Sequence, residues 1–108
     1  MKLQFVYLPT FERTMHHLLT DEGMQRIENE LLDDPRRGDV IPETNGVRKV
    51  RIALPGRGKR GGARITYLYV ETKDRVYFIL AYAKNVKGTM TPTEIKMLAS
   101  LARALKGE

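Results

Sequence analysis

The sequence contains no cysteine among its 108 residues. This absence excludes disulfide bonds, thiolate nucleophiles and cysteine-ligated zinc, and it suits the reducing cytoplasm. The chain also lacks an apolar run of about 18 residues, the length that a membrane-spanning helix needs. Its first stretch, Met1 to Pro9, is typical of a short strand and is too short for a signal peptide. We therefore expect a cytoplasmic protein without a membrane segment.

Residues suited to metal binding are scarce as well. The two histidines, His16 and His17, are adjacent, and neighbouring residues on a helix point in different directions. No second histidine or carboxylate pair lies at ligand spacing, so we expect neither a metal nor another cofactor. A P-loop and a G-x-S-x-G motif are also missing, and the glycine pattern from Gly56 to Gly61 precedes a strand rather than opening a nucleotide-binding helix.

Acidic residues are few in the middle of the chain. Residues 46 to 90 hold eleven of the nineteen basic residues and only two of the thirteen acidic ones, in a chain of net charge +6. A solvated sheet face is the plainer interpretation of such cations. The one-sided distribution, however, is typical of a surface that binds phosphate groups.

Two strand patterns in this basic region flank a glycine-rich loop. Alternation puts the apolar residues of the first strand on one face: Val50, Ile52 and Leu54. Lys49 and Arg51 then lie on the other face and form a cationic floor. The loop from Pro55 to Gly62 contains four glycines, which allow unusual backbone angles and should leave it mobile.

The remaining patterns complete one domain, residues 1–108, of the α+β class. Strand patterns cover Leu3 to Leu8 and Arg75 to Ala83. The second of these strands should form an antiparallel meander with the two basic strands. Helices should begin at threonine caps, namely Thr10, Thr20 and Thr91, and the connection from 35 to 46 should contain no helix. The first two helices should form a hairpin, and the third should run to about residue 105.

The candidate site is a set of cations without a conventional acid-base pair. Its members are Lys49, Arg51, Arg57, Lys59, Arg60 and Arg64, followed by Tyr82, Lys84 and Asn85 at the end of the last strand. Cations stabilise the charge that grows on a phosphate during phosphoryl transfer, and a lysine crowded by cations has a lowered pKa. RNA is a plausible substrate because its own 2′-hydroxyl is the nucleophile.

Three stretches carry a resemblance to a known family. They are Asn45-Gly46-Val47-Arg48-Lys49-Val50-Arg51, Gly58-Lys59-Arg60-Gly61-Gly62-Ala63-Arg64-Ile65 and Tyr82-Ala83-Lys84-Asn85. With the order of elements, they resemble the HigB branch of the RelE/ParE toxin superfamily over essentially the whole chain. The resemblance implies a RelE-like fold, in which an antiparallel sheet carries two N-terminal helices on one face and is followed by a C-terminal helix.

The resemblance also implies a function. The protein would be a type II toxin and a metal-independent endoribonuclease that cleaves mRNA in the ribosomal A site. A HigA-like antitoxin with a helix-turn-helix domain would neutralise it, and operator DNA would be bound only through that antitoxin. Two other functions stay open, because fold alone does not choose between them: a ParE-like toxin that inhibits DNA gyrase, and a non-enzymatic RNA-binding regulator of translation.

By position, the resemblance implies catalytic roles for five residues: Lys49, Arg51, Arg64, Tyr82 and Lys84. We assign RNA contacts to four others: Arg57, Lys59, Arg60 and Asn85. Lys49 and Arg51 would hold and activate the RNA backbone, and Arg64 would stabilise the transition state. Asn85 stands where a second arginine is expected, and the later tyrosine that stacks on a base is missing. The general base is therefore open, and Tyr82 is either a stacking surface or a core residue.

Overall fold

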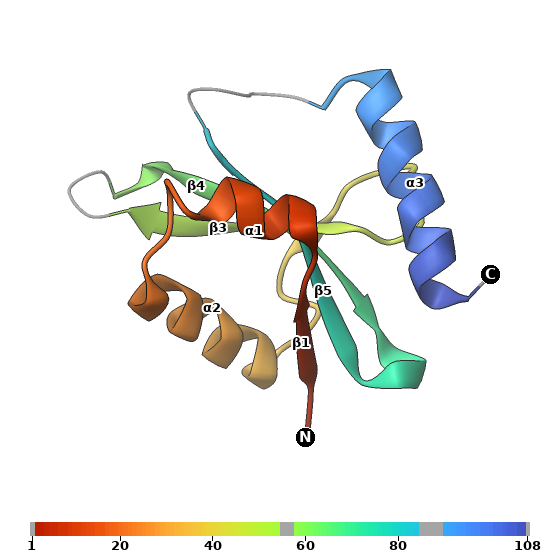
Figure 1. Cartoon of the computed structure of the whole chain (residues 1–108), viewed down its shortest axis with the longest axis horizontal. Helices are drawn as coiled ribbons and strands as arrows, with labels where there is room; N and C mark the ends of the chain where they lie inside the picture. The colour runs from red at the N-terminus through yellow and green to blue at the C-terminus, as the bar shows by residue number, and fades with distance from the viewer. Residues whose placement is uncertain (1, 55–57, 85–89, 108) are drawn as a thin grey trace.

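The computed structural model describes residues 2–54, 58–84 and 90–107, without the side chains of residues 54 and 58–61 (Figure 1). The elements follow in the order β1 (Gln4–Tyr7), α1 (Pro9–Met15), α2 (Asp21–Asp33), β2 (Asp39–Val40), β3 (Arg48–Leu54), β4 (Gly58–Val70), a 3₁₀ turn (Glu71–Lys73), β5 (Arg75–Ala83) and α3 (Pro92–Lys106). The predicted α+β class is confirmed.

The strands form one sheet in the order β1-β5-β4-β3-β2. The predicted meander of β3, β4 and β5 is confirmed, since both of its pairs are antiparallel. β1 pairs with β5 in parallel and makes the sheet mixed. Parallel neighbours cannot be joined by a hairpin, and here the rest of the sheet and both N-terminal helices lie between them in the chain.

Helices pack on both faces of the sheet, α1 and α2 on one face and α3 on the other (Figure 1). Met24, Ile27 and Leu31 form one apolar stripe of α2 and are buried in one cluster with Ile65 and Phe78. A second cluster on the other face joins the apolar side of α3 to β4 and β5, with Leu98, Ala102, Leu68, Val70 and Ile79 as members. None of the helices in the described part of the chain is long and apolar enough to cross a membrane.

Two of the three predicted helix caps are present. The hydroxyl of Thr20 accepts a hydrogen bond from the Gly23 N–H at 3.0 Å. Thr91 and Glu94 form a capping box, in which each side chain accepts a hydrogen bond from the backbone N–H of the other residue. These caps satisfy N–H groups that have no partner within the helix.

The predicted cap at Thr10 is wrong. Pro9 occupies the first turn of α1, where its missing N–H costs nothing, so Thr10 lies inside the helix. Its hydroxyl donates instead to the Ile79 carbonyl oxygen at 2.7 Å and ties α1 to β5. The helix ends at Met15.

The predicted loop from Pro55 to Gly62 is also longer than the real connection. β4 begins at Gly58, which pairs with Leu54, and regular pairing resumes at Ala63 after a shift in register. Extending the hairpin lets more backbone groups find partners. The residues 55–57 lie outside the described part of the chain.

A buried tyrosine fixes the connection from α2 to the sheet. The Tyr67 hydroxyl donates to the Pro35 carbonyl oxygen and accepts from the Gly38 N–H, both at 2.9 Å. Arg48 adds hydrogen bonds to the carbonyl oxygens of Arg36 at 3.1 Å and Gly38 at 2.7 Å. A Cβ at Gly38 would lie 2.9 Å from both the Lys49 oxygen and the Tyr67 ring. The connection therefore lies tightly against β3 and β4.

Within this connection, Asp39 and Val40 form the two-residue strand β2. Asp39 pairs with Lys49 and Val40 with Arg48. The connection contains no helix, as predicted, and is described throughout. The sequence pattern did not predict the strand, because two residues are too few to show alternation.

We predict that Tyr67→Phe lowers the free energy of unfolding by about 1–3 kcal/mol, because the Gly38 N–H and the Pro35 carbonyl lose a buried partner. Urea unfolding followed by circular dichroism measures this change. Tyr69→Phe is the matched control, since no hydrogen bond to the Tyr69 hydroxyl occurs in the described part of the chain. Equal stability of the two variants would show that the hydroxyl does not hold the connection.

Candidate functional site

The register of the meander brings three of the predicted site residues into one row. Arg64 of β4 lies opposite Arg51 of β3 on one side and opposite Tyr82 of β5 on the other. Directly opposed residues of antiparallel strands point to the same face. Val50 and Ile52, the apolar neighbours of Arg51 on β3, point to the other face and are buried as predicted. The row therefore crosses the sheet on the face that bears α3.

Two lysines flank this row. Lys49 lies two positions before Arg51 on β3 and is partly buried, and Lys84 follows the end of β5, where its N–H donates to the Gly62 carbonyl oxygen at 3.2 Å. Lys49, Arg51, Arg64 and Lys84 all line one open groove of about 670 Å³. The structure thus brings together four of the five residues that the resemblance marks as catalytic.

Tyr82, the fifth, is half-buried and does not line the groove. Burial raises the pKa of its phenol, while the charge of Arg64 lowers it and that of Glu94 raises it. The net direction is upward, so the phenol keeps its proton at neutral pH. Tyr82 is therefore suited to donate a hydrogen bond or a proton, and it is unsuited to act as a base.

Arg64 is the most buried of the cations that line the groove. This residue is only 7% exposed, and within the described part of the chain its guanidinium group donates one hydrogen bond, to the adjacent Ala63 carbonyl oxygen at 3.4 Å. No carboxylate in the described residues lies within 4.0 Å of its guanidinium group. Buried charges are usually paired, because moving an ion out of water costs on the order of several kcal/mol even after the protein has relaxed around it. An anion in the groove would supply the missing partner.

The groove also contains charged residues that the sequence analysis did not predict as part of the site. They are Arg26, Glu30, Arg37 and Asp39. Arg37 and Glu30 approach each other to 3.5 Å. All four come from the acidic first part of the chain, and only the packing of α2 and β2 beside β3 brings them to the groove. One signal was available in the sequence: Arg26 and Glu30 lie one helical turn apart, off the apolar stripe of α2.

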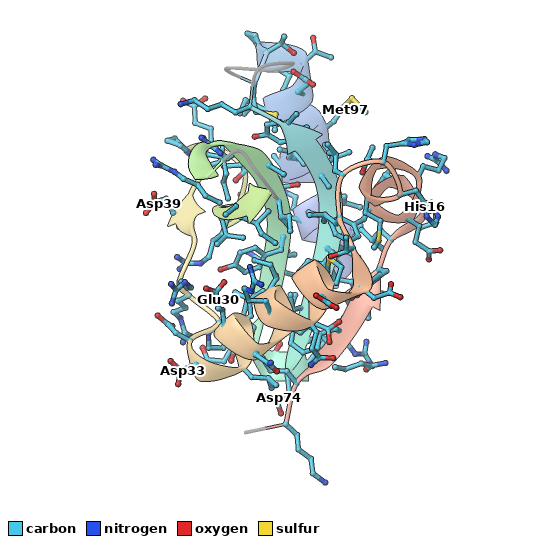
Figure 2. The ribbon with its side chains drawn as sticks, turned by 90° about the vertical axis from the view of Figure 1, so that its left-hand side faces the viewer. His16, Glu30, Asp33, Asp39, Asp74 and Met97 are labelled. Atoms are coloured by element: carbon cyan, nitrogen blue, oxygen red, sulfur yellow. The ribbon has the colours of Figure 1, made fainter. Side chains whose placement is uncertain are left out.

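The residues assigned to RNA contact are only partly placed. Arg57 and Asn85 lie outside the described part of the chain, and Lys59 and Arg60 belong to β4, with side chains that are not described. No cluster of three or more potential metal ligands occurs among the described residues. His16 and His17 lie in an exposed turn after α1, and Figure 2 shows His16 on the opposite side of the molecule from β2.

A solved structure has the same fold as this chain. The structure matches that of the E. coli toxin RelE, solved in the free state as a variant with two arginine-to-alanine substitutions, with a TM-score of 0.59 and 15% sequence identity. The match covers 94% of this chain and 97% of the other. At this identity the match shows that the two proteins share a fold.

The family follows from the sequence itself. Residues 9–107 match the family model described as the RelE toxin of the RelE/RelB toxin-antitoxin system. The chain belongs to the RelE toxin family and is a toxin of a toxin-antitoxin system. The predicted resemblance to the RelE superfamily is confirmed, and the assignment to its HigB branch stays a prediction.

We predict that Arg64→Met leaves the free energy of unfolding unchanged or raises it by about 1 kcal/mol, because an uncompensated buried charge is replaced by an apolar side chain of similar length. Millimolar pyrophosphate should raise the melting temperature of the wild type, since it binds the folded state, and should do so much less for the variant.

Arg103→Met is the control for this pair of measurements, because Arg103 is exposed on α3 away from the groove. This variant should keep the full response to pyrophosphate. A large loss of stability in Arg64→Met with an unchanged pyrophosphate response would make Arg64 a structural residue.

Proposed function

We propose that this toxin is an endoribonuclease that cleaves mRNA in the ribosomal A site and so inhibits translation. The observation that carries the proposal is the buried Arg64, which has no acidic partner among the described residues and lines an open groove with Lys49, Arg51 and Lys84. A ribose-phosphate backbone supplies the anion that this arrangement lacks. A toxin that acts only by covering a protein surface has no need for a desolvated arginine beside three further cations.

The proposed chemistry uses the nucleophile that RNA carries. The 2′-oxygen attacks the adjacent phosphorus while the bond from phosphorus to the 5′-oxygen breaks, which leaves a 2′,3′-cyclic phosphate and a 5′-hydroxyl. Lys49 and Arg51 hold the phosphate oxygens, and Arg64 stabilises the charge that grows on them in the transition state. Lys84, which follows the end of β5 and lines the groove, donates a proton to the leaving 5′-oxygen.

The ribosome has a physical role in this proposal. A 2′-hydroxyl reacts only when it is aligned opposite the leaving 5′-oxygen, and flexible single-stranded RNA rarely adopts that geometry. The groove is open, and a chain of 108 residues offers little surface with which to bend an RNA strand. A codon held in the decoding site can be kept in the reactive geometry. Alignment of the RNA by the ribosome therefore accounts for much of the cleavage rate.

The partners follow from the same proposal. We take residues 1–108 as one toxin domain that acts in the cytoplasm, where translation occurs. Arg57, Lys59, Arg60 and Asn85 are assigned to further contacts with RNA. A HigA-like antitoxin with a helix-turn-helix domain neutralises the toxin, and operator DNA is bound through that antitoxin.

We predict that the purified protein cleaves a message in a programmed ribosome at least about 10²-fold faster than the same message free in solution, because alignment contributes a large part of the rate. Initial rates at equal RNA concentration measure the ratio. Arg64→Met should reduce ribosomal cleavage by about 10²-fold or more, the scale of losing one transition-state donor. Equal rates on free and ribosome-bound RNA would move the assignment to a free-standing ribonuclease.

A further inference from the structure

The proposed reaction lacks a base among the residues that carry the resemblance. The three stretches that carry the resemblance contain no carboxylate or histidine, and burial keeps the proton on Tyr82. A general base has to be unprotonated at the working pH and within hydrogen-bond reach of the 2′-hydroxyl. Two carboxylates line the groove, those of Glu30 and Asp39.

These two carboxylates differ in what surrounds them. Glu30 approaches Arg37 to 3.5 Å, so its charge is already opposed by a neighbour on the groove wall. Asp39 is exposed and has neither an ion pair nor a side-chain hydrogen bond among the described residues. Figure 2 shows Asp39 at the β2 edge of the molecule, with Glu30 on the neighbouring helix α2. The carboxylate of Asp39 is therefore available to a ligand in the groove.

The position of Asp39 is set by the backbone. Asp39 lies directly opposite Lys49, so both side chains point to the cationic face. The preceding residue, Gly38, is held by Tyr67 and Arg48 through two hydrogen bonds of 2.9 and 2.7 Å. A base on a strand anchored in this way is held in place better than one on a free loop.

We propose that Asp39 is the general base of the cleavage reaction and removes the proton from the attacking 2′-hydroxyl. This inference rests on the proposed ribonuclease function. One carboxylate oxygen takes the 2′ proton as the 2′-oxygen bonds to phosphorus. The bond to the 5′-oxygen then breaks, and Lys84 gives that oxygen its proton. Water afterwards returns Asp39 and Lys84 to their starting states.

The order of the strands suits this assignment. Asp39 belongs to β2, Arg51 to β3, Arg64 to β4, and Lys84 follows β5. The base and the acid thus come from strands on opposite sides of Arg51 and Arg64 in the sheet. An in-line displacement needs its base and its acid on opposite sides, because the attacking and leaving oxygens lie on opposite sides of phosphorus.

An acidic residue on an edge strand also has a simpler use, since charged edges prevent strands of different molecules from pairing. The two roles predict opposite effects of Asp39→Asn. If Asp39 only protects the edge, removing a negative charge from a groove that binds a polyanion should strengthen binding and leave cleavage unchanged or faster. If Asp39 is the base, cleavage should fall although binding does not weaken.

The test compares wild type, Asp39→Asn and Asp39→Glu on a message in programmed ribosomes, with binding measured separately. We expect kcat to fall by about 10²-fold or more in Asp39→Asn and to recover in part in Asp39→Glu, with ribosome affinity kept or increased. The residual rate of Asp39→Asn should rise about tenfold per pH unit, because hydroxide then has to remove the proton. The wild-type rate should depend less steeply on pH over this range.

Asp33→Asn is the matched control, because it removes the same charge from an exposed position on α2 outside the groove. It should cleave like the wild type, and melting curves should show all variants folded. Unchanged or faster cleavage by Asp39→Asn would overturn the role of Asp39 and leave the ribonuclease function standing. A loss explained entirely by weaker ribosome binding would overturn it too. If the wild type does not cleave the message, the proposed ribonuclease function is wrong, and so is the role of Asp39 as its base.

Discussion

The register of β3, β4 and β5 is the constraint on which the rest of the structure depends. It places Arg51, Arg64 and Tyr82 side by side on one face while their chain neighbours enter the core on the other. A shift of one residue in either pair would turn the cations toward α1 and α2. The burial of Arg64 is thus a consequence of the same backbone pairing that forms the hydrophobic core.

The helices leave part of this sheet open. α1 and α2 cover the core face, whereas α3 packs on the other face against the stretch of β4 that follows the cationic row, around Leu68 and Val70. The groove occupies the part of that face that α3 leaves uncovered and continues around the edge of β3. The buried Tyr67 hydroxyl then draws the connection after α2 against this edge and brings Asp39 beside Lys49. The same contact therefore stabilises the fold and positions the proposed base.

Much of this arrangement could be predicted from the sequence. Alternation in residues 47 to 54 separates the buried and cationic faces, and short-range motifs at Thr20 and Thr91 predict where two helices begin. The parallel pairing of β1 and the position of β2 could not be predicted, because both depend on contacts between distant parts of the chain. For the same reason Asp39, in a two-residue strand without any periodicity, gave no sign that it lies in the groove.

We propose that the cationic face cuts messages during translation. The most direct measurement is to induce the toxin alone in a bacterium and map new RNA 5′ ends across the transcriptome, beside cells that make Arg64→Met. We expect new 5′-hydroxyl ends within translated coding regions, absent from untranslated RNA and from cells that make the variant. Growth arrest with DNA damage and no new message ends would contradict it and indicate inhibition of gyrase.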